Sequence, residues 1–264
     1  MHAADQRGVD VTVDVPEAGT LDDLLLEEAA REHLLSILAE RKFAVTRGVL
    51  AGSTVRRVVD HLTEVGSTTA AVWEPIQAGA SNFHRRNEAD PRSYVEGVFH
   101  QFNFFPWNPD PLGLFDLLRP VFEVRNLLAG IDRDAHLGGE PTDGMFSRIA
   151  VQFYPHGEGR MNLHRDPVED DQAAACLLVM SRVGVDYKQG GLIVDHGIRC
   201  RPEVDCAPGD IIWLSPDAIH GVDPVDPDKP AGWEGFRGRW VALLPTNRPS
   251  AESSPPDLVD FVES

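Results

Sequence analysis

The stretch from Gln152 to Val168, QFYPHGEGRMNLHRDPV, most constrains how this chain can fold. It is typical of a strand, a turn built from Pro and Gly, and then a His164-x-Asp166 pair at the start of a second strand. Alternate residues of an extended segment project to one face. An imidazole nitrogen and a carboxylate oxygen can therefore meet at one metal ion, while Arg165 points away. The pattern predicts a β-sheet that carries two metal ligands.

A His-x-acid pair alone is weak, because 10 His and 42 acidic residues in 264 give about 1.6 such pairs by chance. The chain has a second pair, His156-x-Glu158, which turn chemistry explains. A third ligand is suggested by 208–225, PGDIIWLSPDAIHGVDPV, where a turn starts an apolar strand and His220 opens the next extended segment. Two His and one carboxylate on one face leave open metal positions, as in non-haem Fe(II) sites.

The segment 235–245, GFRGRWVALLP, is typical of a strand. Arg237 and Arg239 share one face of it, and an arginine inside a barrel is costly unless it is paired. A bound dicarboxylate would pair it, because the guanidinium fork matches a carboxylate. We favour Arg239 as the anchor because an apolar run follows it directly, with Arg237 as the alternative.

These features together resemble the Fe(II)/2-oxoglutarate-dependent oxygenase superfamily over about residues 146–246. The supporting residues are the strand with Tyr154, the Gly190-Gly191-Leu192 turn and the Pro208-Gly209-Asp210 turn. The resemblance implies an α+β protein with a mainly β core. The expected fold is a double-stranded β-helix, or jelly roll (a cupin-like barrel), with N-terminal and inserted helices packed on it.

The resemblance also implies the cofactors: Fe(II) on His164, Asp166 and His220, with 2-oxoglutarate and O2 as co-substrates. The distal carboxylate of 2-oxoglutarate is expected on Arg239. Tyr154 is either a second donor to that carboxylate or a partner of a neighbouring strand. The implied reaction is hydroxylation of an unactivated C–H bond, and desaturation or cyclisation remains an alternative. A non-catalytic, cupin-like ligand-binding jelly roll is the alternative outside enzymes.

A fainter likeness points to bacterial members of the superfamily that act on free amino acids such as lysine, some of them halogenases. It rests on GGLIVDHG, HGVDPV, GRWVALLP and HQFNFFPWN. In those halogenases a small residue replaces the aspartate. Because Asp166 is present, the likeness implies hydroxylation of a lysine-like or other amine-bearing substrate.

Composition narrows the partners and the location. A net charge of −18 disfavours nucleic acid and anionic lipid, and suits a cationic or zwitterionic small molecule. Three cysteines without a CxxC motif and no secretory signal favour a reducing cytoplasm. No apolar run is long enough to span a membrane.

We expect a single oxygenase domain over 1–246, with 1–145 as an elaboration and 146–246 as the core barrel. An acidic, disordered tail is expected over 247–264. The elaboration should hold two strands and three helices. In chain order these are a half-buried strand at 9–15, a helix from a capping box at Thr20-x-x-Asp23 to Arg41-Lys42, a strand at 43–50, a helix capped by Ser53 or Thr54 and ended by Gly66, and a helix from Asp110-Pro111 that Pro120 kinks or splits.

The segment 70–109 is rich in aromatic, Pro, Gly and Asn residues, and we expect it to be irregular. It is either a lid or binding loop, or it seals one end of the barrel. Arg85 or Arg86 could clamp a substrate carboxylate, although such a cluster is more often solvated or paired with nearby acids. With Trp107, these two arginines are the candidate substrate-binding residues.

Overall fold

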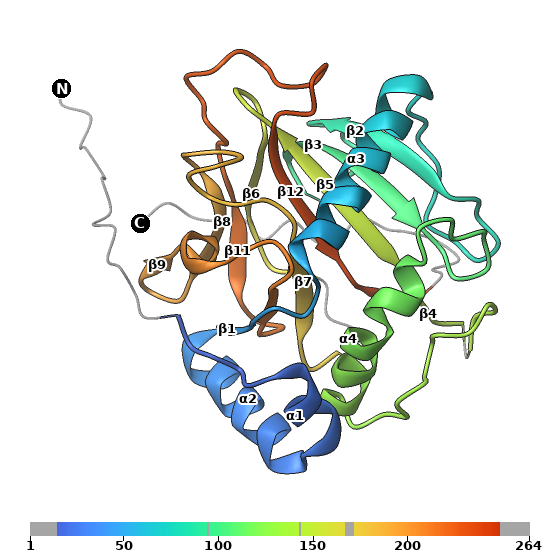
Figure 1. Cartoon of the computed structure of the whole chain (residues 1–264), viewed down its shortest axis with the longest axis vertical. Helices are drawn as coiled ribbons and strands as arrows, with labels where there is room; N and C mark the ends of the chain where they lie inside the picture. Colours follow the sequence, from blue (N-terminus) through green and yellow to red (C-terminus); the bar gives the residue numbers. More distant parts are fainter. Residues whose placement is uncertain (1–14, 94, 143, 167–171, 249–264) are drawn as a thin grey trace.

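The computed structural model describes residues 15–93, 95–142, 144–166 and 172–248. Its centre is a curled β-sheet, with α3 lying across one face and α1, α2 and α4 grouped at one end (Figure 1). The strands are β1 (Phe43–Thr46), β2 (Phe83–Glu88), β3 (Gly97–Phe104), β4 (Phe146–Ser147), β5 (Ile149–Pro155), β6 (Arg160–His164), β7 (Ala175–Val179), β8 (Gly191–Asp195), β9 (Arg199–Cys200), β10 (Ile211–Leu214), β11 (Ile219–Asp223), β12 (Gly238–Leu243) and β13 (Thr246–Asn247). None of the helices in the described parts of the chain has the length and apolar character that a bilayer crossing requires.

The strands from β5 to β12 form the two layers of a jelly roll. One layer has the order β10-β7-β12-β5, extended by β1 at one edge and by β3 and β2 at the other. The second layer has the order β6-β11-β8-β9, and β3 joins it to the first by pairing with β6. The pairings are antiparallel, and many join strands that are distant in sequence, such as β7 with β10 and β12. This arrangement confirms the predicted fold class.

Two apolar cores result, one on each face of the larger layer. Strand alternation sends Val151 and Phe153 to the face that the helices cover, where they join the largest buried cluster. Tyr154 and Val241 face the other way, into a second cluster between the layers. A strand such as β5, buried along its whole length, follows from this double coverage. The space between the layers holds the candidate site.

The helices are α1 (Leu21–Leu26), α2 (Glu28–Arg41), α3 (Gly52–Thr68) and α4 (Leu114–Leu128). The capping box at Thr20 and Asp23 is present, but the expected single helix is split at Glu27, which has extended backbone angles. The predictions for α3 were wrong at both ends. Its N-cap is Ala51, and it continues through Gly66, where an added Cβ would lie 2.5 Å from the Phe236 ring. Close packing therefore explains this glycine.

The helix α4 begins at Leu114 after Gly113, and it stays one helix with Pro120 inside it. In 70–109, the expectation of an irregular segment was wrong, because β2 and β3 form a hairpin that extends the larger layer. Burial on both faces removes the alternation that would reveal β3 in the sequence. The strand expected at 9–15, apart from Val15, and the tail from 249 lie outside the described residues.

Candidate metal centre

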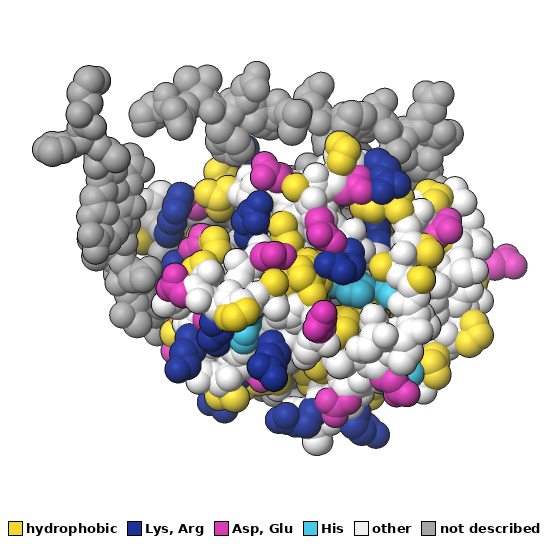
Figure 2. Space-filling view, turned by 90° about the horizontal axis from the view of Figure 1, so that it is seen from above, with side chains coloured by type: hydrophobic (Ala, Val, Ile, Leu, Met, Phe, Trp, Pro, Cys, Tyr) yellow, Lys and Arg dark blue, Asp and Glu magenta, His cyan; other side chains and the backbone are white. Residues whose placement is uncertain are grey.

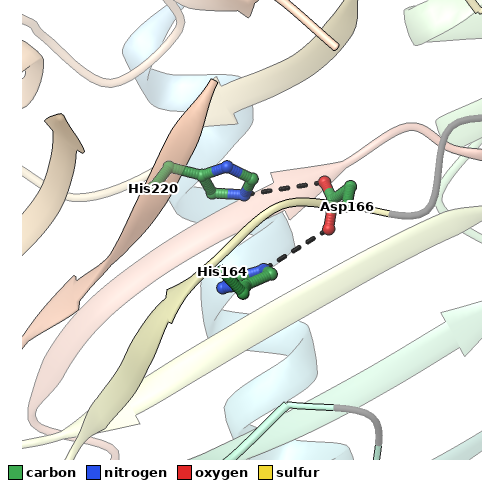
Figure 3. A group of neighbouring side chains, drawn as sticks. All are labelled: His164, Asp166 and His220. Atoms are coloured by element: carbon green, nitrogen blue, oxygen red, sulfur yellow. Dashed lines mark ion pairs between the residues drawn. The ribbon is translucent and has the colours of Figure 1, made fainter. Parts of the chain in front are cut away.

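His164, Asp166 and His220 lie together where β6 ends and β11 begins, facing the larger layer (Figure 3). His164 is the last residue of β6, not the start of a strand, and Asp166 follows just beyond it. The Nε2 atoms of His164 and His220 lie 3.4 Å and 3.6 Å from the two Asp166 oxygens. The three potential ligand atoms all lie within 4.8 Å of one another. This is the one such group of three found among the described residues.

Backbone carbonyls orient both imidazoles. Nδ1 of His164 lies 2.9 Å from the Asn162 carbonyl oxygen, and Nδ1 of His220 lies 3.1 Å from that of Ala218. Each Nδ1 then carries the proton and donates it, which leaves the Nε2 lone pair directed at the shared point. Burial lowers the pKa of His220, and a neutral imidazole is the form that binds a metal.

The donor set fits an octahedral metal with open positions. For bonds of about 2.1 Å, ligand atoms at right angles lie about 3.0 Å apart. The two His–Asp separations are a few tenths of an ångström longer, and the three ligand atoms all lie within 4.8 Å of one another, so side-chain shifts are needed to close on one ion. Two imidazoles and one carboxylate on adjoining strand ends leave the opposite side open to the space between the layers.

That space is a cavity of about 340 Å³, within the size range of small-molecule sites. The three metal-site residues line it, together with Tyr154 and Arg239. Apolar residues cover much of the remaining wall: Phe99, Leu177, Leu192, Val222, Val241 and Leu243. The site is therefore enclosed by apolar side chains, with a small number of polar groups at defined positions.

Arg239 on β12 is 1% exposed and makes an ion pair with Glu203 of η1 (Pro202–Asp205). Its Nε lies 2.8 Å and 2.9 Å from the two Glu203 oxygens, and its Nη2 lies 2.7 Å from one of them. The Tyr187 hydroxyl and the Leu192 amide also donate to Glu203. Burial alone raises the pKa of Glu203, but the adjacent guanidinium outweighs it and lowers the pKa below its ordinary value.

This pairing corrects the reasoning that a bound dicarboxylate must balance the interior arginine. Glu203 occupies one edge of the guanidinium, so the full fork is not open to a ligand. The Nη1 atom of Arg239 is buried without a hydrogen-bond partner. Since Arg239 lines the cavity, Nη1 is a donor that a ligand carboxylate can use.

Tyr154 lies opposite Arg239 in the β5–β12 register, and its ring is 5.0 Å from the guanidinium carbon. Its hydroxyl donates to Oε1 of Gln152 at 2.6 Å. Donation to a ligand would require this hydroxyl to leave Gln152. The pair therefore supplies one polar spot on the wall beside Arg239.

The other candidate residues are dispersed. Arg237 precedes β12 and is exposed, whereas Arg85 lines the cavity. Arg86 pairs with Glu88 at 3.0 Å and stacks on Trp233, and it is not among the cavity-lining residues.

Trp107 donates to the Ala80 carbonyl at 2.7 Å and packs on Phe105 and Phe146, in a small cluster outside the cavity wall. The segment 70–109 also contributes to the cavity itself, through Ile76, Ser93 and Val95.

Three further cavity-related residues carry no signal in the sequence: Glu203, Arg125 and Arg148. Glu203 lies in a polar connection, Arg125 in a helix that also carries other charged residues, and Arg148 between β4 and β5. Their burial became visible only with the fold. The surface gives little further indication: in Figure 2 acidic and basic side chains are interspersed rather than gathered by sign.

No protein-family model and no curated protein sequence matches this chain. Among solved structures, the chain is similar to two prolyl hydroxylases and to an oxidoreductase of the 2OG-Fe(II) oxygenase family. A Pseudomonas putida prolyl-4-hydroxylase has 15% identity and a TM-score of 0.49, over 81% of this chain and 96% of that one. A Trichoplax adhaerens prolyl hydroxylase, in complex with a hypoxia inducible factor peptide, has 12% identity and a TM-score of 0.49, over 85% of this chain and 90% of that one. A Burkholderia pseudomallei oxidoreductase of the 2OG-Fe(II) oxygenase family has 14% identity and a TM-score of 0.45, over 90% of this chain and 95% of that one.

Proposed function

We propose that this protein is an Fe(II)- and 2-oxoglutarate-dependent oxygenase that hydroxylates a C–H bond of a small molecule. The observation that carries the proposal is the convergence of His164, Asp166 and His220 on one point of an enclosed cavity. In the same cavity, Nη1 of Arg239 has no hydrogen-bond partner and can donate to a ligand carboxylate. A purely structural metal site would not need open ligand positions beside a cavity.

The metal ligands in this proposal are His164, Asp166 and His220. Both imidazoles keep their orientation through Nδ1 donation to backbone carbonyls, so the ligand nitrogens are fixed before any ion arrives. Asp166 supplies the one negative charge, which favours a divalent cation over a neutral ligand. When bound, Fe(II) with 2-oxoglutarate and O2 supplies the oxidising power, and 2-oxoglutarate leaves as succinate and CO2.

Arg239 would hold the distal carboxylate of 2-oxoglutarate through Nη1. Glu203 fixes the guanidinium from behind and leaves that nitrogen directed away from the ion pair. Tyr154 and Gln152 sit beside it as polar neighbours. The apolar wall between Arg239 and the metal ligands excludes water, which strengthens each polar contact in the cavity.

We infer a free amino acid as the substrate, lysine-like or otherwise amine-bearing, in a cytoplasmic setting. A cavity of about 340 Å³ that also holds a metal and 2-oxoglutarate leaves room for a small molecule only. The retained carboxylate at Asp166 favours hydroxylation over halogenation. Desaturation or ring closure by the same site is the second outcome that product analysis would separate.

The test is 2-oxoglutarate turnover with Fe(II) across the twenty amino acids and common amines, followed as succinate and product mass. We expect at least one compound to stimulate succinate release and to gain one oxygen atom. His164→Ala should abolish both signals, whereas the matched control His33→Ala, on the exposed side of α2, should retain them. Metal binding without succinate formation under any of these compounds would favour a ligand-binding jelly roll instead.

Asp166→Gly tests the role of the carboxylate. If Asp166 binds the metal, hydroxylation should fall at least about tenfold, and added chloride should restore turnover with chlorinated product. Unchanged hydroxylation in this variant would show that Asp166 is not a ligand.

A further inference from the structure

The cavity has a second cationic end, distant from Arg239. Along β5 and the residue before it, Arg148, Ala150, Gln152 and Tyr154 all line the cavity, as strand alternation requires. Arg148 is six residues from Tyr154, or about 20 Å at ~3.3 Å per residue. Because Tyr154 lies opposite Arg239, the two arginines mark opposite ends of the cavity.

Arg125 of α4 joins Arg148 at this second end. Its Nη1 donates to the Leu244 carbonyl at 2.8 Å, just beyond the end of β12. Its Nη2 donates to Asn126 and to Ser147, at 2.9 Å in both cases. Arg125 is 2% exposed, and all three of these acceptors are uncharged. A buried guanidinium held by neutral acceptors alone keeps its positive charge uncompensated.

Arg148 is 7% exposed and is held by amides. Its Nε donates to Oδ1 of Asn247 at 2.9 Å, and its Nη1 donates to Oδ1 of Asn103. The Nδ2 atom of Asn103 is itself buried without a hydrogen-bond partner. Asn103 pairs with Ala150 in the β3–β5 register, and Ala150 lines the cavity. An unused donor therefore lies beside Arg148.

The charge of the cavity wall is opposite to that of the protein. The chain carries −18 overall, yet the described lining residues include four arginines and one acid, Asp166. Glu203 balances Arg239, whereas the hydrogen-bond acceptors of Arg125 are uncharged. A buried positive charge of this kind stabilises an anion more strongly than it would in water.

The metal ligands lie between the two ends. Met161 of β6 is 3.9 Å from the Tyr154 hydroxyl, and His164 is three residues farther along the same strand. That places His164 about 10 Å from the Arg239 end. A molecule anchored at Arg125 and Arg148 would therefore extend toward the metal from the side opposite the proposed 2-oxoglutarate anchor.

We propose that Arg125 and Arg148 form a carboxylate subsite that anchors the substrate. The inference rests on the proposed function and narrows its substrate class to molecules that carry a carboxylate, such as the α-carboxylate of a free amino acid. Arg148 and the neighbouring Asn103 supply the donors, and Arg125 supplies uncompensated charge. Amines that lack a carboxylate are poor ligands for this site.

The test compares each amino acid with its own carboxamide, by thermal shift of the full chain under anaerobic conditions. Saturating Mn(II) and 2-oxoglutarate fill their proposed sites first. We expect at least one amino acid to raise the melting temperature in a concentration-dependent way. The carboxamide of that amino acid should need an at least about tenfold higher concentration to give the same shift in melting temperature, because a charge-assisted contact is lost.

Arg148→Gln then separates this subsite from direct chelation of the metal by an amino acid. It should weaken binding of the acid at least about tenfold and leave the amide nearly unchanged. Arg119→Gln is the matched control, since Arg119 is a half-exposed arginine of α4 that pairs with Glu123 and Asp134. Arg148→Lys should retain part of the affinity that Arg148→Gln loses if charge is the cause.

Three results would overturn the proposed subsite. The first is equal binding of an amino acid and its carboxamide, the second is amino-acid binding that Arg148→Gln does not change, and the third is no shift in melting temperature with any amino acid. Failure of the proposed function looks different. In that case Fe(II) and 2-oxoglutarate give no succinate, while acids still bind in preference to amides. The opposite pattern is turnover with an amine that lacks a carboxylate. That result would support the proposed oxygenase function and contradict the proposed carboxylate subsite.

Discussion

Replacing Glu203 with alanine should cost this protein a large part of its stability. Glu203 is 3% exposed and is the counter-charge of Arg239, which is 1% exposed. Without it, a guanidinium stays charged between two β-layers with no acid beside it. Breaking a buried ion pair from one side typically costs about 3–5 kcal/mol. The Tyr187 hydroxyl and the Leu192 amide lose their acceptor as well.

These contacts belong to one network, so their losses are not additive. We expect Glu203→Ala to lower the free energy of unfolding by about 3–5 kcal/mol in total, which is less than the sum of the separate contacts. The whole free energy of unfolding of a native protein is only about 5–15 kcal/mol. Equilibrium urea unfolding at neutral pH measures the change directly. The exposed pair of Lys42 and Asp217, at 2.8 Å, provides the control. Asp217→Ala should cost less than about 1 kcal/mol.

A double variant tests the cause. Glu203→Leu combined with Arg239→Met removes both charges and should recover stability to within about 2 kcal/mol of the wild type, because paired replacement by apolar groups is often neutral. The reasoning fails if Glu203→Ala costs less than about 1 kcal/mol. It also fails if the double variant is no more stable than Glu203→Ala alone.

Three further outcomes follow from the packing. Burial, with His84 and Arg86 nearby, lowers the pKa of His100 to about 3. The contribution of neutral His100 to the free energy of unfolding is complete above about pH 6.5 and is lost as the pH falls, by about 2 kcal/mol at pH 5. The free energy of unfolding should therefore fall less steeply with decreasing pH in His100→Gln, and an unchanged slope would contradict the assignment. Gly209→Ala should destabilise by at least about 2 kcal/mol in urea unfolding, because φ is +108° and a Cβ would meet the Leu50 carbonyl oxygen at 1.9 Å. Gly48→Ala, also at positive φ but with open space, should cost only about 1–2 kcal/mol; equal losses at the two glycines would show that the clash is relieved.

The three candidate metal ligands could be proposed from the sequence because their signal is local. His164-x-Asp166 needs only an extended backbone, and His220 follows a recognisable Pro-Gly-Asp turn. The strands β8 and β10 were likewise predictable, since Gly and Pro punctuate short apolar runs. What the sequence could not show is which ends of these strands meet, because that depends on pairing between distant segments.

The charged groups around the cavity were beyond prediction for the same reason. Glu203 pairs with Arg239 across a connection in which neither hydrophobic periodicity nor a motif marks a buried acid. Arg125 is one of two arginines of α4, and nothing in the sequence pattern separates it from the half-exposed Arg119. The β2–β3 hairpin was missed because its strands are buried on both faces in part, so their residues do not alternate.

Binding of Mn(II) to the metal-free protein, measured by titration calorimetry, tests the central claim most directly. One ion should bind per chain, with affinity at least about tenfold lower in His164→Ala, Asp166→Ala and His220→Ala, and unchanged in His33→Ala. Wild-type affinity in His220→Ala, or no binding to the wild type, would contradict the convergence of these three side chains on a metal ion.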